Sequence, residues 1–327
     1  MSMSRRQILR TASVSALPFY CGLQAQTSAS LELVKIVSGF PPGGTVDVIA
    51  RRVADKLRGK YATNAMVENK PGAAGQIGIL TVKDSPADGS VLLLTPSSML
   101  SIYPFTYPKL QYNVDDVVPV SLAAYGDHAL AVGPGVPASV STLKQFLDWV
   151  KANPEKGNFG SPGAGSMPHM VGVLVSKQSG VSLNHIPYRG TVPGIQDLLG
   201  GQISSFWGPI GDYLAHAKSG KLRVLAVSGK TPNIFLPGVP TLRAQGFDLA
   251  VREWYGFFLP GKASAEVIRR AAEQLAPVFG QPDLVDYIKG FGLEAHGSSP
   301  SHLRDLLQAD AAEWRQLIRQ IGFTAES

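Results

Sequence analysis

IVSGFPPGGTVDVIARRVADKL, residues 36–57, begins with an apolar run, continues with a Pro-Pro-Gly-Gly loop and ends with apolar residues at helical spacing. This order predicts a strand that leads through a glycine loop into a helix over 46–57. Glycines allow the backbone to approach a ligand closely, and the free N–H groups of a first helical turn favour negative charge. The spacing fits an anion-binding loop and an ordinary turn equally well, because Asp47 could simply offset the helix dipole.

The rest of the chain repeats the alternation of short apolar runs and amphipathic stretches. Strands are predicted at 33–38, 65–68, 91–94, 129–132, 181–186, 204–207, 222–227 and 256–259. Helices are predicted at 46–57, 143–152, 167–179, 194–199, 212–219, 265–279 and 300–321. Continuous β-branched and leucine runs separated by helices indicate an α/β protein with a largely parallel sheet, whose ligand lies at the carboxyl ends of the strands.

Composition narrows the class of protein. The chain has 327 residues, of which 44% are hydrophobic and 17% charged, so it can bury the core of one large or two ordinary domains. Its formal net charge is +6, but no Lys/Arg run with interleaved aromatics is present, which argues against nucleic-acid binding. The six histidines show no metal-ligand spacing and no nucleotide fingerprint is complete, so neither a metal nor a cofactor is predicted.

The N-terminus has the form of an export signal. Residues 4–10, SRRQILR, resemble a twin-arginine motif, and a mildly apolar run over 11–22 follows. We predict a signal peptide over 1–25, cleaved near Ala25, and a periplasmic location, with the choice between twin-arginine and general export left open. A disordered basic tail is the alternative. Cys21, the only cysteine, lies inside this segment, so thiol chemistry is not expected of the mature chain.

A second glycine-rich loop occurs in NFGSPGAGSMPHM, residues 158–170. Here too a short strand runs into small residues and then a helix, which predicts a second anion-friendly helix start with the hydroxyls of Ser161 and Ser166 as extra donors. A hydrolase using one of these serines with His169 is a rival hypothesis. However, Gly-x-Ser-x-Gly is absent, and no orienting acid lies near in sequence. A single histidine at this place is more typical of helix packing than of a base.

A third segment, HIPYRGTVPGIQDLLGGQ at residues 185–202, places Tyr188, Arg189 and Gly190 between a predicted strand and a helix. That position suits residues that line a cleft. Arg189 could pair with a carboxylate or be an ordinary solvated arginine, and spacing alone does not separate the two.

Together these segments resemble the Bug family of extracytoplasmic solute receptors, the binding proteins of tripartite tricarboxylate-type transport. The similarity covers about residues 33–324 and is carried by eight runs in family order: GFPPGGTVDVIARRVADKL, VENKPGAAGQIG, SPADGSVLLLTPSS, DWVKANPEKGNFGSPGAGSMPHM, IPYRGTVPGIQDLLGGQI, SGKLRVLAVSGK, LPGVPTLRAQGF and EWYGFFLPGKAS. The resemblance implies a two-lobed, Venus-flytrap fold of the type II periplasmic binding class. It also implies lobe 1 at 33–129 plus 254–327 and lobe 2 at 130–253.

By the same resemblance, two strand-to-helix loops hold a ligand carboxylate, Asp47 braces the first of them, and further residues line the cleft. The ligand-binding residues so predicted are Phe40, Pro42, Gly43, Gly44, Thr45, Asp47, Ser97, Ser161, Gly163, Gly165, Ser166, His169, Tyr188, Arg189, Gly190 and Trp207. We therefore expect a monomeric binding protein, with no catalysis, that delivers a small organic acid to the membrane components of a transporter. A receptor that feeds a sensor protein is the alternative.

One departure from the family pattern concerns the far end of the cleft. Ser204 and Gly208 stand where the family often has acidic residues, and the second acid can meet a positive group of an amino-acid-like ligand. Its absence beside the bulky Trp207 argues against an amine-bearing ligand and towards a neutral or aromatic tail.

Overall fold

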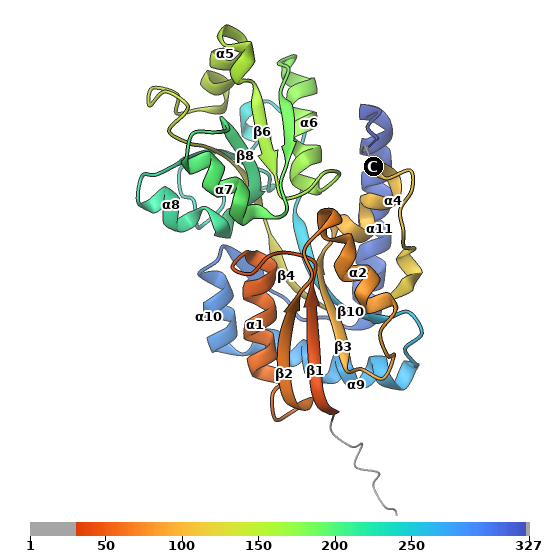
Figure 1. Ribbon diagram of the computed structural model, residues 1–327. Helices are drawn as coiled ribbons and strands as arrows, with labels where there is room; N and C mark the ends of the chain where they lie inside the picture. The colour runs from red at the N-terminus through yellow and green to blue at the C-terminus, as the bar shows by residue number, and fades with distance from the viewer. Residues whose placement is uncertain (1–30, 325–327) are drawn as a thin grey trace, which may run out of the picture.

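The computed structural model describes residues 31–324, which form two β-sheets with helices packed against them (Figure 1). The first sheet has six strands in the order β11-β4-β10-β3-β1-β2, and the second has five in the order β7-β6-β8-β5-β9. From here on, lobe 1 is the part built on the six-stranded sheet and lobe 2 the part built on the five-stranded sheet. The predicted two-lobed α/β architecture is confirmed.

Lobe 1 contains the six strands of the first sheet, and lobe 2 contains the five strands of the second. The strands of lobe 1 are β1 (Leu31–Ser38), β2 (Ala62–Asn69), β3 (Val91–Pro96), β4 (Val117–Gly126), β10 (Glu253–Pro260) and β11 (Leu293–Ala295). Those of lobe 2 are β5 (His128–Val132), β6 (Asn158–Ser161), β7 (Asn184–Pro187), β8 (Ser205–Pro209) and β9 (Arg223–Val227). The helices are α1 (Thr45–Leu57), α2 (Gln76–Lys83), α3 (Ser98–Ser101), α4 (Tyr103–Thr106), α5 (Leu143–Ala152), α6 (Met167–Ser179), α7 (Thr191–Leu199), α8 (Leu214–Lys218), α9 (Ala265–Leu275), α10 (Pro282–Lys289) and α11 (Pro300–Ile321).

Both sheets are mixed rather than uniformly parallel. In lobe 1, β1 is parallel to β2 and β3, whereas β10 runs antiparallel between β3 and β4, and β11 is antiparallel to β4. In lobe 2, β6 is parallel to β7 and β8, and β5 is antiparallel to β8 and β9. Most strands of each sheet still point the same way, and the strands that enter a lobe from the other one, β5 and β10, run against them.

The chain passes between the lobes at two places. β4 ends at Gly126 and β5 begins at His128, so Asp127 alone separates the two sheets there, and the chain returns to lobe 1 at Glu253. His128 and Ala129 therefore pair in lobe 2, although the sequence assigned them to lobe 1, and Glu253 pairs in lobe 1 although it was assigned to lobe 2. These shifts are small, but they move His128 and Glu253 onto the strands that join the lobes.

Local chemistry accounts for the other differences from the predicted elements. The helix predicted at 265–279 ends as an α-helix at Leu275, and Pro277, which has no N–H, follows in a 3₁₀ segment. The helix predicted at 194–199 begins earlier, at Thr191, because a proline is tolerated in a first turn whose N–H groups have no helical partner. The strand predicted at 181–186 begins only at Asn184, after the left-handed Gly180 that ends α6.

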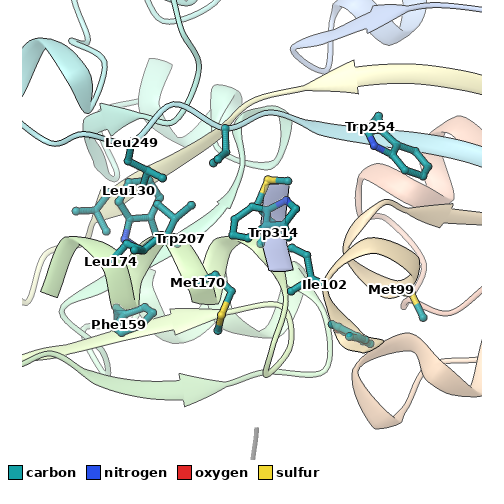
Figure 2. Packing of buried hydrophobic residues seen from close by; sticks show 14 of the residues in the cluster. Met99, Ile102, Leu130, Phe159, Met170, Leu174, Trp207, Leu249, Trp254 and Trp314 are labelled. Carbon is teal, nitrogen blue, oxygen red and sulfur yellow. The ribbon is translucent and has the colours of Figure 1, made fainter. Parts of the chain in front are cut away.

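The largest apolar core cluster is continuous between the lobes (Figure 2). Phe159, Met170 and Trp207 of lobe 2 belong to the same cluster as Trp254 and Trp314 of lobe 1. The long helix α11, which carries Trp314, packs on β4 and also contacts α6. The lobes are thus joined on this side by packed side chains as well as by the two crossing segments.

Candidate functional site

A cavity of about 50 Å³ lies between the lobes, where the carboxyl ends of strands meet the first turns of helices. Its lining comes from both lobes and consists of Phe40, Pro41, Gly44, Thr45, Val46, Pro96, Ser98, Tyr103, His128, Pro162, Ser166, Pro168, Thr191, Val192, Pro209, Glu253 and Tyr255. Of the predicted ligand residues, Phe40, Gly44, Thr45 and Ser166 belong to this lining. No lysine or arginine is among the lining residues, so an anion here would depend on backbone N–H groups, hydroxyls and helix dipoles.

Asp47 holds the first loop in shape. Its carboxylate accepts hydrogen bonds from the Gly43 N–H at 2.9 Å, from Arg51 Nε at 2.8 Å and from Asn69 Nδ2 at 2.9 Å. Burial by itself would raise the pKa of Asp47, but the hydrogen bonds from Arg51, Gly43 and Asn69 outweigh it and hold the pKa below its ordinary value. Asp47 therefore acts on the loop and does not line the cavity, and neither do Pro42 and Gly43, which are exposed.

Gly44 is the glycine of the first loop that lines the cavity. It is the N-cap of α1 at φ −86° and ψ 172°, and a Cβ added there would meet no atom within 4 Å. The next two residues, Thr45 and Val46, also line the cavity and are the first two of α1. The N–H groups of a first helical turn have no helical partner, so this end of α1 presents donors and the positive end of the helix dipole.

The second loop is held by its own hydroxyls and by a pair of histidines. Ser161 Oγ donates to Gly163 O at 3.0 Å, and Ser166 Oγ donates to the same oxygen at 2.7 Å. The Gly165 N–H donates to His169 Nδ1 at 2.9 Å. Both serine protons are therefore used within the loop, contrary to their predicted use as donors to a ligand, and only Ser166 reaches the cavity.

His169 stacks on His185 beneath this loop, with ring centroids 3.4 Å apart and planes at 13°. Burial lowers the pKa of His169 to about 2, with a further lowering from His185, and burial lowers the pKa of His185 to about 4. Both rings are therefore neutral at physiological pH, and His185 Nε2 lies 2.8 Å from Ser161 Oγ. His169 supports the loop as a packed histidine and is not among the residues that line the cavity, so its role as a ligand residue stays a prediction.

The third segment contacts lobe 1 through its glycine. Gly190 has φ +99°, and a Cβ there would lie 2.7 Å from Pro41 Cδ of the first loop, so the two loops meet at this point. The Tyr188 hydroxyl donates to Asp197 Oδ2 at 2.8 Å, and burial together with Asp197 raises the pKa of that tyrosine. Arg189 is exposed and Gly163 packs close to Ala74, so neither lines the cavity.

Trp207 is a core residue and not part of the cleft. Its side chain is fully buried and belongs to the largest core cluster, while Phe206 on the opposite face of β8 belongs to another. Among the residues of β8, only Pro209 at its carboxyl end lines the cavity. Both faces of this central strand are covered, so Trp207 fills core space in this structure, and a contact between Trp207 and a ligand stays a prediction.

Glu253 and His128 are cavity residues that sequence reasoning missed. Both are 2% exposed and lie at the first positions of β10 and β5. Glu253 Oε1 accepts hydrogen bonds from the Ser98 N–H at 3.0 Å and from the Ser97 hydroxyl. The buried side chain of Ser97 is thus used by Glu253, and Ser97 is not among the residues that line the cavity. His128 Nε2 lies 3.1 Å from Glu253 Oε2. No local motif marks these two residues, because only the pairing of the crossing strands brings them together.

Asp212 joins the lobes beside the same cavity. The Thr45 hydroxyl of α1 donates to Asp212 Oδ1 at 3.0 Å, although Asp212 follows β8 in the other lobe. Burial raises the pKa of Asp212 to about 6, against the opposing effect of hydrogen bonds from Thr45 and Thr191 and of the charge of His128. Asp212 is therefore an acid near the end of β8. It lies four residues beyond Gly208, which stands where the family often has an acidic residue.

Two further hydrogen bonds cross the cleft. The Met167 N–H at the start of α6 donates to Ser98 Oγ at 3.0 Å, and the Tyr107 hydroxyl donates to Ala164 O at 2.8 Å. Ser98 Oγ in turn donates to the Glu253 carboxylate at 3.0 Å, so the second loop is linked through Ser98 to the crossing strand β10. The lobes are in contact around the cavity.

Within the described residues 31–324, no cluster of three or more metal-ligating side chains is present. Over the same range, none of the helices has both the length and the apolar character needed to cross a bilayer.

A cavity enclosed by two α/β lobes, with loops from each and two crossing segments, defines the class of two-lobed solute-binding proteins. The model of the tripartite tricarboxylate transporter family receptors matches residues 49–323. The chain therefore belongs to this receptor family, which confirms the predicted Bug-type resemblance and makes it a binding protein by family and not an enzyme.

Relatives match along nearly their whole length. A protein encoded in the tcbD-tcbE intergenic region of Pseudomonas sp. (strain P51) is 30% identical, over 99% of this chain and 96% of the relative. Protein BugT of Bordetella pertussis is 28% identical, over 88% of this chain and 89% of the relative. The structure of the periplasmic binding protein BugD, 27% identical, superposes with a TM-score of 0.82 and covers 89% of this chain and 98% of BugD.

Two structures at 23% identity share the fold. One is the R. palustris protein Rpa4515 with adipate, at a TM-score of 0.84, covering 89% of this chain and 98% of that one. The other is MatC from Rhodopseudomonas palustris with bound malate, at a TM-score of 0.80, covering 88% of this chain and 98% of that one.

Proposed function

We propose that the protein captures a small carboxylate-containing organic acid between its lobes and delivers it to the membrane components of a tripartite tricarboxylate-type transporter. The observation that carries the proposal is the convergence of helix starts from both lobes on one cavity. Thr45 and Val46 begin α1, and Thr191 and Val192 begin α7, and all four residues line it. Free N–H groups and the dipoles at helix starts stabilise an anion, and the absence of charged lysine or arginine from the lining leaves this as the means of binding.

Binding from two lobes gives the ligand a conformational consequence. A carboxylate that touches α1 and α7 together has more contacts when the lobes are closed, so binding favours the closed form by that difference in affinity. The cavity of about 50 Å³ has room for only a few water-sized groups, since one needs about 10–15 Å³. Entry of an organic acid therefore requires the lobes to part, and closure follows binding by a hinge motion at the crossing segments.

Isothermal titration of the purified chain with small mono- and dicarboxylates tests this function, with adipate and malate as first probes and the corresponding diamide of one acid as the uncharged control. Saturable binding of an acid and none of its amide supports a carboxylate site. Equal binding of both, or no binding across the panel, contradicts it.

The transporter and the compartment are further parts of the proposal. Gene neighbourhood and co-purification with transporter membrane components distinguish delivery for transport from the alternative, in which the closed form is recognised by a sensor protein. The export signal and cleavage near Ala25 lie outside the described residues. Mass determination of the mature chain from a periplasmic extract tests them, and the elution volume of the same sample tests the expected monomer.

A further inference from the structure

A second cavity, of about 310 Å³, lies beside the segments that join the lobes, and none of its lining residues lines the ligand cavity. We call it the hinge cavity. Its lining contains Asp127, which separates β4 from β5, and Ala250 and Arg252 of the segment that returns to lobe 1. The other walls are Glu294 of β11 in lobe 1 and the loop 230–234 in lobe 2. Both lobes and both crossing segments therefore contribute to the hinge cavity.

The hinge cavity and the ligand cavity lie on opposite sides of the crossing segments. Successive side chains of an extended chain point to opposite faces. Glu253 and Tyr255 line the ligand cavity, whereas Arg252, the residue before Glu253, lines the hinge cavity. In the same way His128 lines the ligand cavity, and Asp127, the residue before it, lines the hinge cavity. Each crossing segment thus separates the two spaces.

Polar contacts hold the crossing segments together on the side of the hinge cavity. Arg252 Nε donates to Asp127 Oδ1 at 3.1 Å, and Arg252 Nη2 pairs with Glu294 Oε1 of lobe 1 at 2.6 Å. Asn233 Nδ2 of lobe 2 donates to Asp127 Oδ2 at 2.8 Å. Asp127 and Arg252 are therefore bound to each other and to one residue of each lobe, and they mark the line about which the lobes turn.

The two cavities respond in opposite ways to a hinge motion about this line. A rotation that parts the lobes at the ligand cavity brings their walls together on the other side of the crossing segments. In this structure the lobes are in contact around the ligand cavity, and the hinge cavity has its volume of about 310 Å³ in that state. Opening of the lobes therefore narrows the hinge cavity.

We propose that the hinge cavity sets the affinity for the ligand without touching it, because a group that fills this cavity resists opening of the lobes. The inference rests on the proposed function, in which binding is coupled to closure. The affinity that a titration measures depends on the fraction of molecules in the binding-competent form. Bulk that fits the hinge cavity in the closed form and clashes in the open form raises this fraction, so the ligand binds more tightly although none of its contacts changes.

Substitutions at Ala250 test the proposal, because this small side chain lines the hinge cavity. Ala250→Leu and Ala250→Trp add increasing bulk. We expect the affinity for adipate or malate, whichever wild type binds more tightly, to rise in that order, by about 5- to 30-fold for tryptophan. Ala244→Trp, at an exposed alanine of the same lobe that lines neither cavity, is the control and should leave the affinity unchanged. Titration calorimetry measures the affinities, and thermal unfolding shows which variants are folded.

Small-angle scattering adds a second measurement, which needs no ligand. The free Ala250→Trp variant is expected to have a smaller radius of gyration than free wild type, because its open form is disfavoured. Ala250→Leu takes its place in both measurements if the tryptophan variant does not fold. Unchanged or weaker affinity of the folded Ala250 variants, or a radius equal to that of wild type, would overturn the role of the hinge cavity and leave the carboxylate site standing. If wild type binds no acid of the panel, the proposed function is contradicted, and the radii still decide the role of the hinge cavity.

Discussion

Replacing Gly44 with valine separates binding from folding at the first loop. Gly44 lies at φ −86° and ψ 172°, in the extended region that valine readily adopts, and a Cβ there meets no atom within 4 Å. The folded chain therefore accepts the substitution with little strain. The added methyl groups project into the space beside Thr45 and Val46 where the ligand carboxylate is proposed to lie.

The expected effect follows from the hydrogen bonds that the valine blocks. A hydrogen bond to a charged group contributes about 1.5–3 kcal/mol, and loss of one weakens binding about 10- to 150-fold. If the methyl groups keep the carboxylate from two N–H groups, the loss exceeds about 100-fold. The melting temperature should change by less than about 4 °C, the shift that corresponds to about 1 kcal/mol in a chain of this size class.

Substitutions at two other glycines, Gly280 and Gly43, serve as controls for the effect of Gly44→Val on binding. Gly280 also has open space where a Cβ would be added and no left-handed φ, but it does not line the cavity, so Gly280→Val should leave both affinity and melting temperature unchanged. Gly43 has φ +88°, so Gly43→Ala should lower stability by about 1–2 kcal/mol through backbone strain. Titration and thermal unfolding of the three variants are compared with wild type. Affinity of Gly44→Val within about threefold of wild type would refute the first loop as the carboxylate site.

Three other predictions concern the loops, the lobe contact and the core. The folded-state pKa of His185, about 4, is below the ordinary 6.5, so its neutral form contributes stability that is present above pH 6.5 and is lost as pH falls towards 4. The variant His185→Gln should therefore lose less stability than wild type over that pH window, by up to about 1.4 kcal/mol per pH unit. Urea titrations of both proteins at several pH values measure the difference. Thr45→Val removes the hydrogen bond to Asp212 across the cleft, and small-angle scattering should show a larger radius of gyration than wild type, whereas equal radii would mean that this contact does not hold the lobes. Trp207→Phe should lower the free energy of unfolding by about 1–3 kcal/mol and leave ligand affinity unchanged. Weaker binding at unchanged stability would mean that Trp207 contacts the ligand.

Elements with strong local signals could be predicted from sequence to the residue. The helices α5, α6 and α11 have the predicted bounds, and α5 and α11 begin after a capping Thr142 and Ser299 whose side chains accept from the first turn. The loops that follow β1 and β6 were found for the same reason, since glycines before a helix are a local pattern. These are features in which neighbouring residues carry all of the information.

Features that depend on distant pairing were missed or only partly right. β4 contains Pro119 and lacks clear alternation, so its place beside β10 could not be seen from its own residues. The antiparallel insertion of β10 between β3 and β4 also escaped prediction, and with it the position of Glu253. Arg189, predicted from its place in a loop, is exposed, because a loop position does not determine which way a long side chain extends.

Thr45 and Ser98 form hydrogen bonds across the cleft and also line the cavity, and this couples closure to recognition. Thr45 donates to Asp212 across the cleft, and Ser98 receives the Met167 N–H from lobe 2 while it donates to Glu253. A ligand that enters between the lobes must either keep these hydrogen bonds or replace them with its own. A molecule with a carboxylate alone can replace only acceptors, because it offers no donors, and it leaves Asp212 without compensation. A molecule that carries donors as well as acceptors can replace both kinds of hydrogen bond, so ligands of that kind should stabilise the closed form most.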